Sequence, residues 1–137
     1  MLILITMNVT QLRVYMESME AFREIENIAK LLYGELSDTK RQVLRSSKSI
    51  PPLISEGYGR KSSQRAFRRF VVEAMSSSDE TITHLDIIAS SQFNHVPVEL
   101  LGKAKERYIS ISKQLNSLAK VITTNLKSDI RDPKSDV

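Results

Sequence analysis

Nine basic residues lie within thirty positions near the middle of the chain, and such side chains bind anions. From Lys40 to Arg69 the sequence holds nine Lys or Arg residues and one acidic residue, Glu56, a net charge of +8. The other positions carry 11 basic and 15 acidic residues, so the total charge is only +4. Six of the nine are arginines, whose planar guanidinium binds phosphate or carboxylate through paired hydrogen bonds. The pattern favours an anionic partner over the alternative of an ordinary solvated helix surface.

The expected contact residues come from this basic segment. Arg68 and Arg69 lie three and four positions after Arg65, so at least two of these three arginines share one helix face. Tyr58 is the only aromatic residue near the segment outside the expected core, so we expect contacts to a nucleic-acid backbone rather than to stacked bases. The predicted nucleic-acid-binding residues are Arg41, Arg45, Lys48, Arg60, Lys61, Arg65, Arg68 and Arg69.

Other arrangements that could support catalysis or hold a cofactor are weak. His84 and His95 are eleven positions apart, and no Glu-x-x-His pair is present, so no metal site is predicted. The serine run 76–78 has no base near it in sequence and is interpreted as small packing residues. The segment 57–60 lacks the preceding strand that a nucleotide-binding loop requires. A small anion-binding nest formed by its backbone is an alternative interpretation. The sequence therefore predicts a protein that is not an enzyme and has no cofactor.

The composition limits the class of protein. A chain of 137 residues with 41% hydrophobic residues is long enough for one domain with a real core. Four glycines, four prolines and no tryptophan argue against a β-sandwich or barrel, and the absence of cysteine fits a reducing compartment. The apolar start, residues 1–7, is too short for a membrane span or a secretory signal, so we expect a cytoplasmic protein without membrane contact. Met7 as the native start and an arm that packs on a neighbouring subunit are both open interpretations of this segment.

Apolar spacings of three and four residues predict an all-α protein. The helices are expected at about 11–36, 38–58, 63–90 and 97–126, after an N-terminal arm (1–10) and before a flexible tail (127–137). Short connections between long helices place neighbours antiparallel, which indicates an up-down four-helix bundle. The first helix is expected to bury the stripe Leu12, Met16, Met19, Phe22, Ile25, Ala29, Leu32 and Leu36.

Local signals refine the helix ends. Ser37 or Asp38 is expected to cap the second helix, and Ser62 or Ser63 the third. Pro51-Pro52 predicts an interruption and a kink in the second helix, because proline removes a donor and clashes with the preceding turn. Gly57 or Gly59 is expected to end that helix in the left-handed conformation.

The stretch from about Gln42 to Leu85 resembles the four-helix bundle proteins encoded in 23S rRNA intervening sequences, which are similar to the accessory variability proteins of diversity-generating retroelements. This stretch departs from the family pattern at Leu53, Ser55 and Ser76. Gln42 and Arg45 also fit the pattern upstream of its core. The positions that match the core pattern are Ser49, Ile50, Pro51, Ile54, Glu56, Gly57, Gly59, Arg60, Phe67, Phe70, Ala74, Ser77 and Glu80.

The resemblance implies a bundle that assembles as a homopentamer. In the retroelement branch it also implies a basic surface that binds nucleic acid and a reverse transcriptase, whereas the intervening-sequence branch has no established activity. The leading hypothesis is thus a non-enzymatic, oligomeric bundle that binds RNA or DNA, as an accessory factor to an RNA or a reverse transcriptase. The alternative is a protein-interaction scaffold whose basic band docks an acidic partner or a neighbouring subunit.

Overall fold

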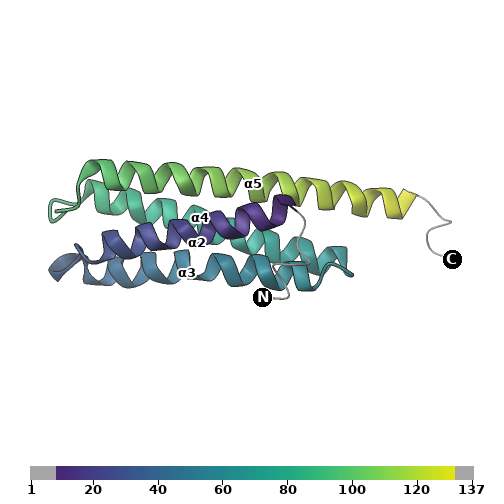
Figure 1. Cartoon of the computed structure of the whole chain (residues 1–137), viewed down its shortest axis with the longest axis horizontal. Coiled ribbons are helices and arrows are strands. Elements are labelled where there is room, and N and C mark those ends of the chain that lie inside the picture. Colours follow the sequence, from purple (N-terminus) through teal and green to yellow (C-terminus); the bar gives the residue numbers. More distant parts are fainter. Residues whose placement is uncertain (1–8, 132–137) are drawn as a thin grey trace.

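The chain folds into four long helices packed side by side. The computed structural model describes residues 9–131, with side chains described for residues 10–128, so most of the predicted arm and part of the predicted tail lie outside the described residues. The elements in chain order are α2 (Val9–Ala29), the short 3-10 helix η1 (Gly34–Leu36), α3 (Ser37–Gly59), α4 (Gln64–Ser90) and α5 (Val98–Arg131). Consecutive helices run antiparallel (Figure 1), and the predicted all-α four-helix bundle is confirmed.

The first helix ends earlier than its apolar spacing predicts. α2 stops at Ala29, and the chain then turns through Gly34, whose φ of +61° is the only positive value in the described residues. Leu32 and Leu36 are nevertheless buried, so the apolar period continues across the turn, and for that reason the prediction of a helix to 36 was wrong. η1 leads directly into α3, which has no side-chain cap at its start, so the predicted Ser37 or Asp38 cap is also wrong.

The two prolines do not interrupt α3. The helix continues through Pro51 and Pro52 to Gly59, which contradicts the predicted interruption. The φ angle that proline imposes is compatible with a helix. Each proline therefore destabilises the helix only through a lost hydrogen bond and local steric crowding. The kink stays a prediction.

Gly57 lies inside α3 in an ordinary helical conformation, and so does Gly59, so the predicted left-handed helix end is wrong. A Cβ built on Gly57 would lie 2.9 Å from the Cβ of Phe70 on α4. Gly57 is buried in this contact, whereas a Cβ on Gly59 would meet nothing within 4 Å. Gly57 is therefore required for the close approach of α3 and α4, not for its backbone freedom.

The other two helices agree more closely with the sequence. Ser63 caps α4 as predicted, since its hydroxyl oxygen accepts a hydrogen bond from the Ala66 amide at 3.3 Å. α5 follows Pro97 and continues to Arg131, past the predicted end at 126, so the first five residues of the predicted flexible tail (127–131) are helical. In the described residues no helix is both long and apolar enough to cross a membrane.

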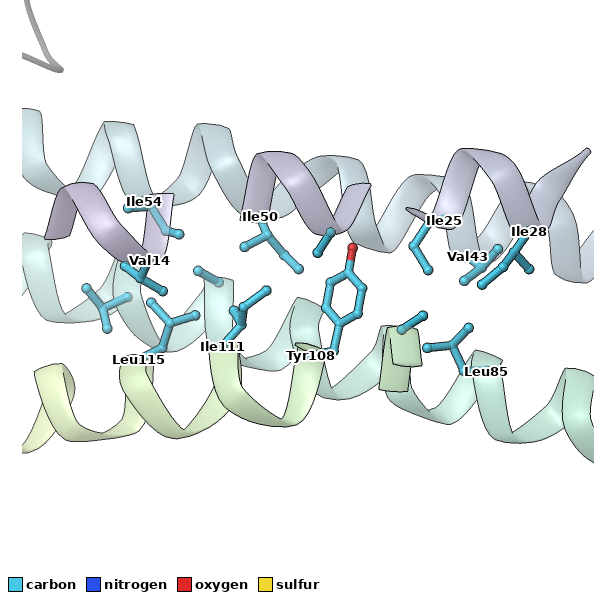
Figure 2. Close-up of a cluster of buried hydrophobic side chains, with 14 of the residues drawn as sticks. Val14, Ile25, Ile28, Val43, Ile50, Ile54, Leu85, Tyr108, Ile111 and Leu115 are labelled. Atoms are coloured by element: carbon cyan, nitrogen blue, oxygen red, sulfur yellow. The ribbon is translucent and has the colours of Figure 1, made fainter. Parts of the chain in front are cut away.

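The core contains side chains from all four helices, and Figure 2 shows part of it between the helices. The buried residues of α3, α4 and α5 largely match the stripes that the same spacing predicts. The predicted stripes are Val43, Leu44, Ser47, Ile50, Ile54 and Tyr58 in the second helix, Phe67, Phe70, Val71, Ala74, Ser77, Thr81, Leu85 and Ile88 in the third, and Leu101, Ala104, Tyr108, Ile111, Leu115, Leu118 and Ile122 in the fourth. α2 differs, because Met16 and Met19 are 46% and 39% exposed. In the first part of α2 the buried side chains, Val14, Ser18 and Ala21, are offset from the predicted stripe, whereas Ile25 and Ala29 are buried as predicted. The apolar surface of α2 is thus wider than the face that is buried in the core.

Small polar residues form a layer across the middle of the core. The Ser46 and Thr81 hydroxyls are 2.8 Å apart, and Ser78 donates to the Tyr108 carbonyl at 3.0 Å. Tyr108 itself is completely buried and points across the bundle (Figure 2). In the described part of the chain no group completes a hydrogen bond with its hydroxyl, and burial raises the pKa of the Tyr108 phenol, an effect that nearby Ser47 only partly offsets.

The Gly57 contact gives the first prediction. Gly57→Ala is expected to lower the free energy of unfolding by about 1–3 kcal/mol, because the added methyl group overpacks the contact with Phe70. Gly59→Ala is the matched control and should leave stability unchanged or raise it, since alanine favours a helix by about 0.5–1 kcal/mol over glycine. Urea denaturation followed by circular dichroism measures both. Equal stability of the two variants would contradict the close approach.

The second prediction concerns alkaline pH. The usual pKa of a tyrosine is 10.0, so above that pH the unfolded chain loses the Tyr108 proton while the folded chain keeps it. The free energy of unfolding should therefore fall by up to about 1.4 kcal/mol per pH unit above pH 10. Tyr108→Phe should lack this part of the fall, so denaturation curves of the two proteins at pH 8 and pH 11 should diverge. A constant difference between them at both pH values would show that the phenol is not held neutral.

Candidate nucleic-acid interface

All eight predicted contact residues are exposed on the folded chain, but they do not form one continuous band. Because α3 and α4 run antiparallel, the residues near the connecting turn gather at one end of the bundle. We call these five the turn cluster: Arg60, Lys61, Arg65, Arg68 and Arg69. The remaining three, which we call the α3 group, lie toward the other end of the helix: Arg41, Arg45 and Lys48.

Carboxylates neutralise two members of the α3 group. Arg41 pairs with Asp38 one turn away, at 2.6 Å. Arg45 pairs with Glu80 of α4 and also donates to Gln42 at 3.2 Å. Glu80 lies outside the basic segment in sequence, and only the antiparallel packing of α4 on α3 brings its carboxylate to Arg45. The predicted basic band is thus interrupted by Glu80, an acidic residue that lies outside the basic segment 40–69 in the sequence.

Lys48 lies in a different environment. It lines a groove of about 320 Å³ between α2 and α3, together with apolar side chains that include Tyr15, Met19 and Phe22. Pro51 and Pro52 form the α3 wall of this groove. Lys48 therefore borders an apolar surface rather than an anion site.

The turn cluster, in contrast, has one carboxylate partner among the described residues. Arg60 pairs with Glu56 at 3.0 Å, and the spacing of the two residues, one helical turn apart, predicts this pair from the sequence. Lys61 donates to the Tyr58 hydroxyl at 2.9 Å, and Arg68 donates to Thr123 of α5 at 2.7 Å. Arg65 forms no ion pair with any carboxylate that the structure describes. Four of the five charges are consequently not neutralised by any carboxylate that the structure describes.

An aromatic ring holds two of these arginines in place. The guanidinium of Arg60 lies 5.6 Å from the centre of the Phe70 ring, and that of Arg69 lies 5.0 Å from the same ring. Stacking of this kind restricts a guanidinium while its N–H groups stay available to an acceptor. The Phe70 that contacts Gly57 therefore also organises the turn cluster.

Helix α5 adds basic residues that the sequence analysis missed. The contact between Arg68 and Thr123 places the last turns of α5 beside the first turns of α4. Lys120 and Lys127 lie three and four positions from Thr123 and are exposed. No sequence signal pointed to them, because they are about fifty residues away from the basic segment.

The result is a bundle whose charge lies at one end. The half of the bundle that contains the α3–α4 turn (residues 10–18, 49–75 and 114–128) has eight basic and three acidic residues. The other half (residues 19–48 and 76–113) has ten basic and ten acidic residues. The eight basic residues are Arg13, Arg60, Lys61, Arg65, Arg68, Arg69, Lys120 and Lys127, and the three acidic ones are Glu17, Glu56 and Glu73.

The start of α4 increases this positive potential. Ser63 caps the helix, and its first turn holds no acidic residue. A helix N-terminus carries about half a positive charge, so Arg65, in the first turn, lies where a basic residue costs stability unless an anion is present. The end of the bundle can thus attract phosphate groups.

The described residues offer little for other chemistry. No three His, Cys, Asp or Glu side chains among them are placed to hold a metal ion. The predicted packing role of the serine run is supported at Ser78, which is buried and whose hydroxyl lies 2.7 Å from the hydroxyl of Ser112 on α5. Ser112 donates to Asp79 at 2.7 Å, so these groups tie α4 to α5.

Comparisons with known proteins agree with this fold. No curated protein matches the chain. A crystal structure at 1.70 Å of a protein of unknown function from the S23 ribosomal protein family of Bacteroides thetaiotaomicron is similar to it, with a TM-score of 0.72 and 24% identity. The match covers 82% of this chain and 99% of that one. The family model of the 23S rRNA-intervening sequence protein matches residues 10–124, so the chain belongs to the family of 23S rRNA-intervening sequence proteins.

Proposed function

We propose that the protein is a non-enzymatic, oligomeric bundle that binds the backbone of RNA or DNA through its turn cluster, as an accessory factor to an RNA or a reverse transcriptase. The observation that carries this proposal is the concentration of charge at one end of the bundle, with eight basic residues against three acidic ones. Arginines that are preorganised by an aromatic ring and lack carboxylate partners suit phosphate oxygens.

The site is narrower than the one expected from sequence. The α3 group is left out, because Arg41 and Arg45 already have carboxylate partners and Lys48 borders an apolar groove. Lys120 and Lys127 are included, since they extend the basic surface from α4 onto α5. The described aromatic side chains near the cluster, Tyr58 and Phe70, are buried or covered by basic groups, so the contacts read the backbone and not the bases.

Self-association is the second part of the proposal, and a specific surface supports it. The outer side of α2 carries a strip of exposed or partly exposed apolar side chains, the second apolar face: Leu12, Tyr15, Met16, Met19 and Phe22. It borders the groove of about 320 Å³ at Pro51 and Pro52. A second copy that covers this face would bury the stripe that the sequence pattern assigned to the core, and repetition of the turn cluster around a ring of five would multiply its positive charge.

Charge reversal tests the nucleic-acid site. Arg65→Glu/Arg68→Glu/Arg69→Glu should weaken binding of a structured RNA and of duplex DNA at least about tenfold, because several phosphate contacts are lost together. About five phosphate contacts would give duplex DNA a slope of log K against log salt near −4 to −5, and the variant should have a shallower slope. Fluorescence anisotropy at rising salt concentration measures both quantities.

The matched control is Arg23→Glu/Lys30→Glu/Lys113→Glu, which makes the same change in net charge with three exposed residues of the balanced half. It should reduce affinity much less. Equal losses in the two variants would show that net charge, not the turn cluster, governs binding. Binding of an acidic polypeptide without binding of either nucleic acid would instead favour the protein scaffold.

Substitution on α2 tests the assembly. Met16→Lys/Met19→Lys should convert the oligomer to a monomer, since it places two charges on the second apolar face. Ile87→Lys/Val98→Lys is the matched control, because these residues are also exposed and apolar but lie at the other end of the bundle. Light scattering after size-exclusion chromatography gives the mass of each. A wild-type mass of 15.6 kDa, that of one chain, would refute the oligomer.

A further inference from the structure

One carboxylate oxygen lies between two basic side chains where α3 packs against α4. Glu80 Oε2 forms the ion pair with Arg45 of α3, and the same atom lies 3.5 Å from Nε2 of His84, one turn farther along α4. The His84 Nε2 atom is buried and completes no hydrogen bond with a group that the structure describes. His84 therefore faces a carboxylate that Arg45 already uses.

No other charged group among the described residues forms an ion pair with these three side chains. α4 packs against α3 and α5. The charged contact from α3 is Arg45 and the one within α4 is Glu80, whereas the basic residues of α5 at this end engage other carboxylates. The other ion pairs of this half are Arg41–Asp38, Lys105–Asp86, Lys103–Glu24, Arg107–Glu20 and Arg107–Glu24. The charge of His84 thus decides how Glu80 is shared.

A proton on the imidazole changes this sharing. Histidine side chains gain a proton between about pH 8 and pH 5, and an imidazolium at His84 would compete with Arg45 for Glu80. The exposed fraction of each side chain decides the competition, since His84 is 17% exposed and Arg45 is 60% exposed. Water can solvate the Arg45 guanidinium after it leaves the carboxylate, but a buried imidazolium depends on its counterion. His84 therefore retains Glu80, and Arg45 is released.

We propose that His84 is a pH-dependent switch that releases Arg45 from Glu80 in mildly acidic solution and thereby adds Arg45 to the anion-binding surface. The three side chains then change from a net charge of zero to +1. Arg45 lies fourteen residues before Gly59, the last residue of α3, which corresponds to about 21 Å along the helix. Its release extends the positive surface from the turn cluster along α3. The use of this surface for nucleic acid rests on the proposed function, whereas the release itself does not.

Nuclear magnetic resonance tests the release without any nucleic acid. Between pH 8 and pH 5.5 the N–H signal of Arg45 Nε should move toward the position that it has in Glu80→Gln, where the ion pair is absent. His84→Gln should abolish this movement. His95→Gln is the matched control and should keep it, because His95 is the other histidine of the chain and is exposed in the α4–α5 loop. A signal that stays in place in the wild type, or moves equally in His84→Gln, would overturn the switch.

Fluorescence anisotropy with duplex DNA at the same two pH values and constant ionic strength tests the consequence. The wild type and His95→Gln should gain about threefold or more in affinity on acidification, because one phosphate contact is added. His84→Gln and Arg45→Gln should lack this gain, and Glu80→Gln should already bind more tightly than the wild type at pH 8. An undiminished gain in His84→Gln or Arg45→Gln would overturn the proposal. Absence of DNA binding at both pH values would refute the proposed function instead, and the Arg45 signal would still decide the switch.

Discussion

The close contact of α3 with α4 at Gly57 is the constraint on which the described surface depends. A side chain at this position would collide with the Cβ of Phe70, so glycine allows the two backbones to approach. The contact fixes the antiparallel pairing next to the turn, and the same pairing brings Glu80 to Arg45 farther along. It also positions the Phe70 ring, on which Arg60 and Arg69 stack. One small residue thus connects the packing of the hairpin to the arrangement of its charges.

The central layer of small polar residues serves the same packing. Ser46, Thr81 and Ser78 are buried, and their hydroxyls bond to one another or to backbone carbonyls, so close helix contact does not leave them unsatisfied. Tyr108 is the exception, because its hydroxyl is buried without a completed hydrogen bond in the described part of the chain. A bundle with a uniform aliphatic core would accept several registers, whereas these specific contacts favour one.

The charge distribution separates the two ends of the molecule into different roles. At one end basic residues from α2, the α3–α4 turn, α4 and α5 converge with few acidic neighbours, and at the other end the charges balance. There Arg107 bridges Glu20 and Glu24 of α2 and helps to hold α5 in register. The balanced end therefore contributes ion pairs between helices, whereas the basic end carries an excess of positive charge.

The sequence by itself determined the helices, the core stripes of α3, α4 and α5, the Ser63 cap and the Glu56–Arg60 pair, because each depends on spacings of three to four residues along one helix. It did not determine the end of α2, since Leu32 and Leu36 keep the apolar period through the turn at Gly34. Nor did it reveal that Met16 and Met19 face outward, because the direction of a wide apolar stripe is set by the neighbouring helices. The tertiary structure alone decided that Glu80 neutralises Arg45 and that Lys120 and Lys127 join the turn cluster. The physical reason is that charge acts through space, and antiparallel packing brings together residues that the chain keeps tens of positions apart.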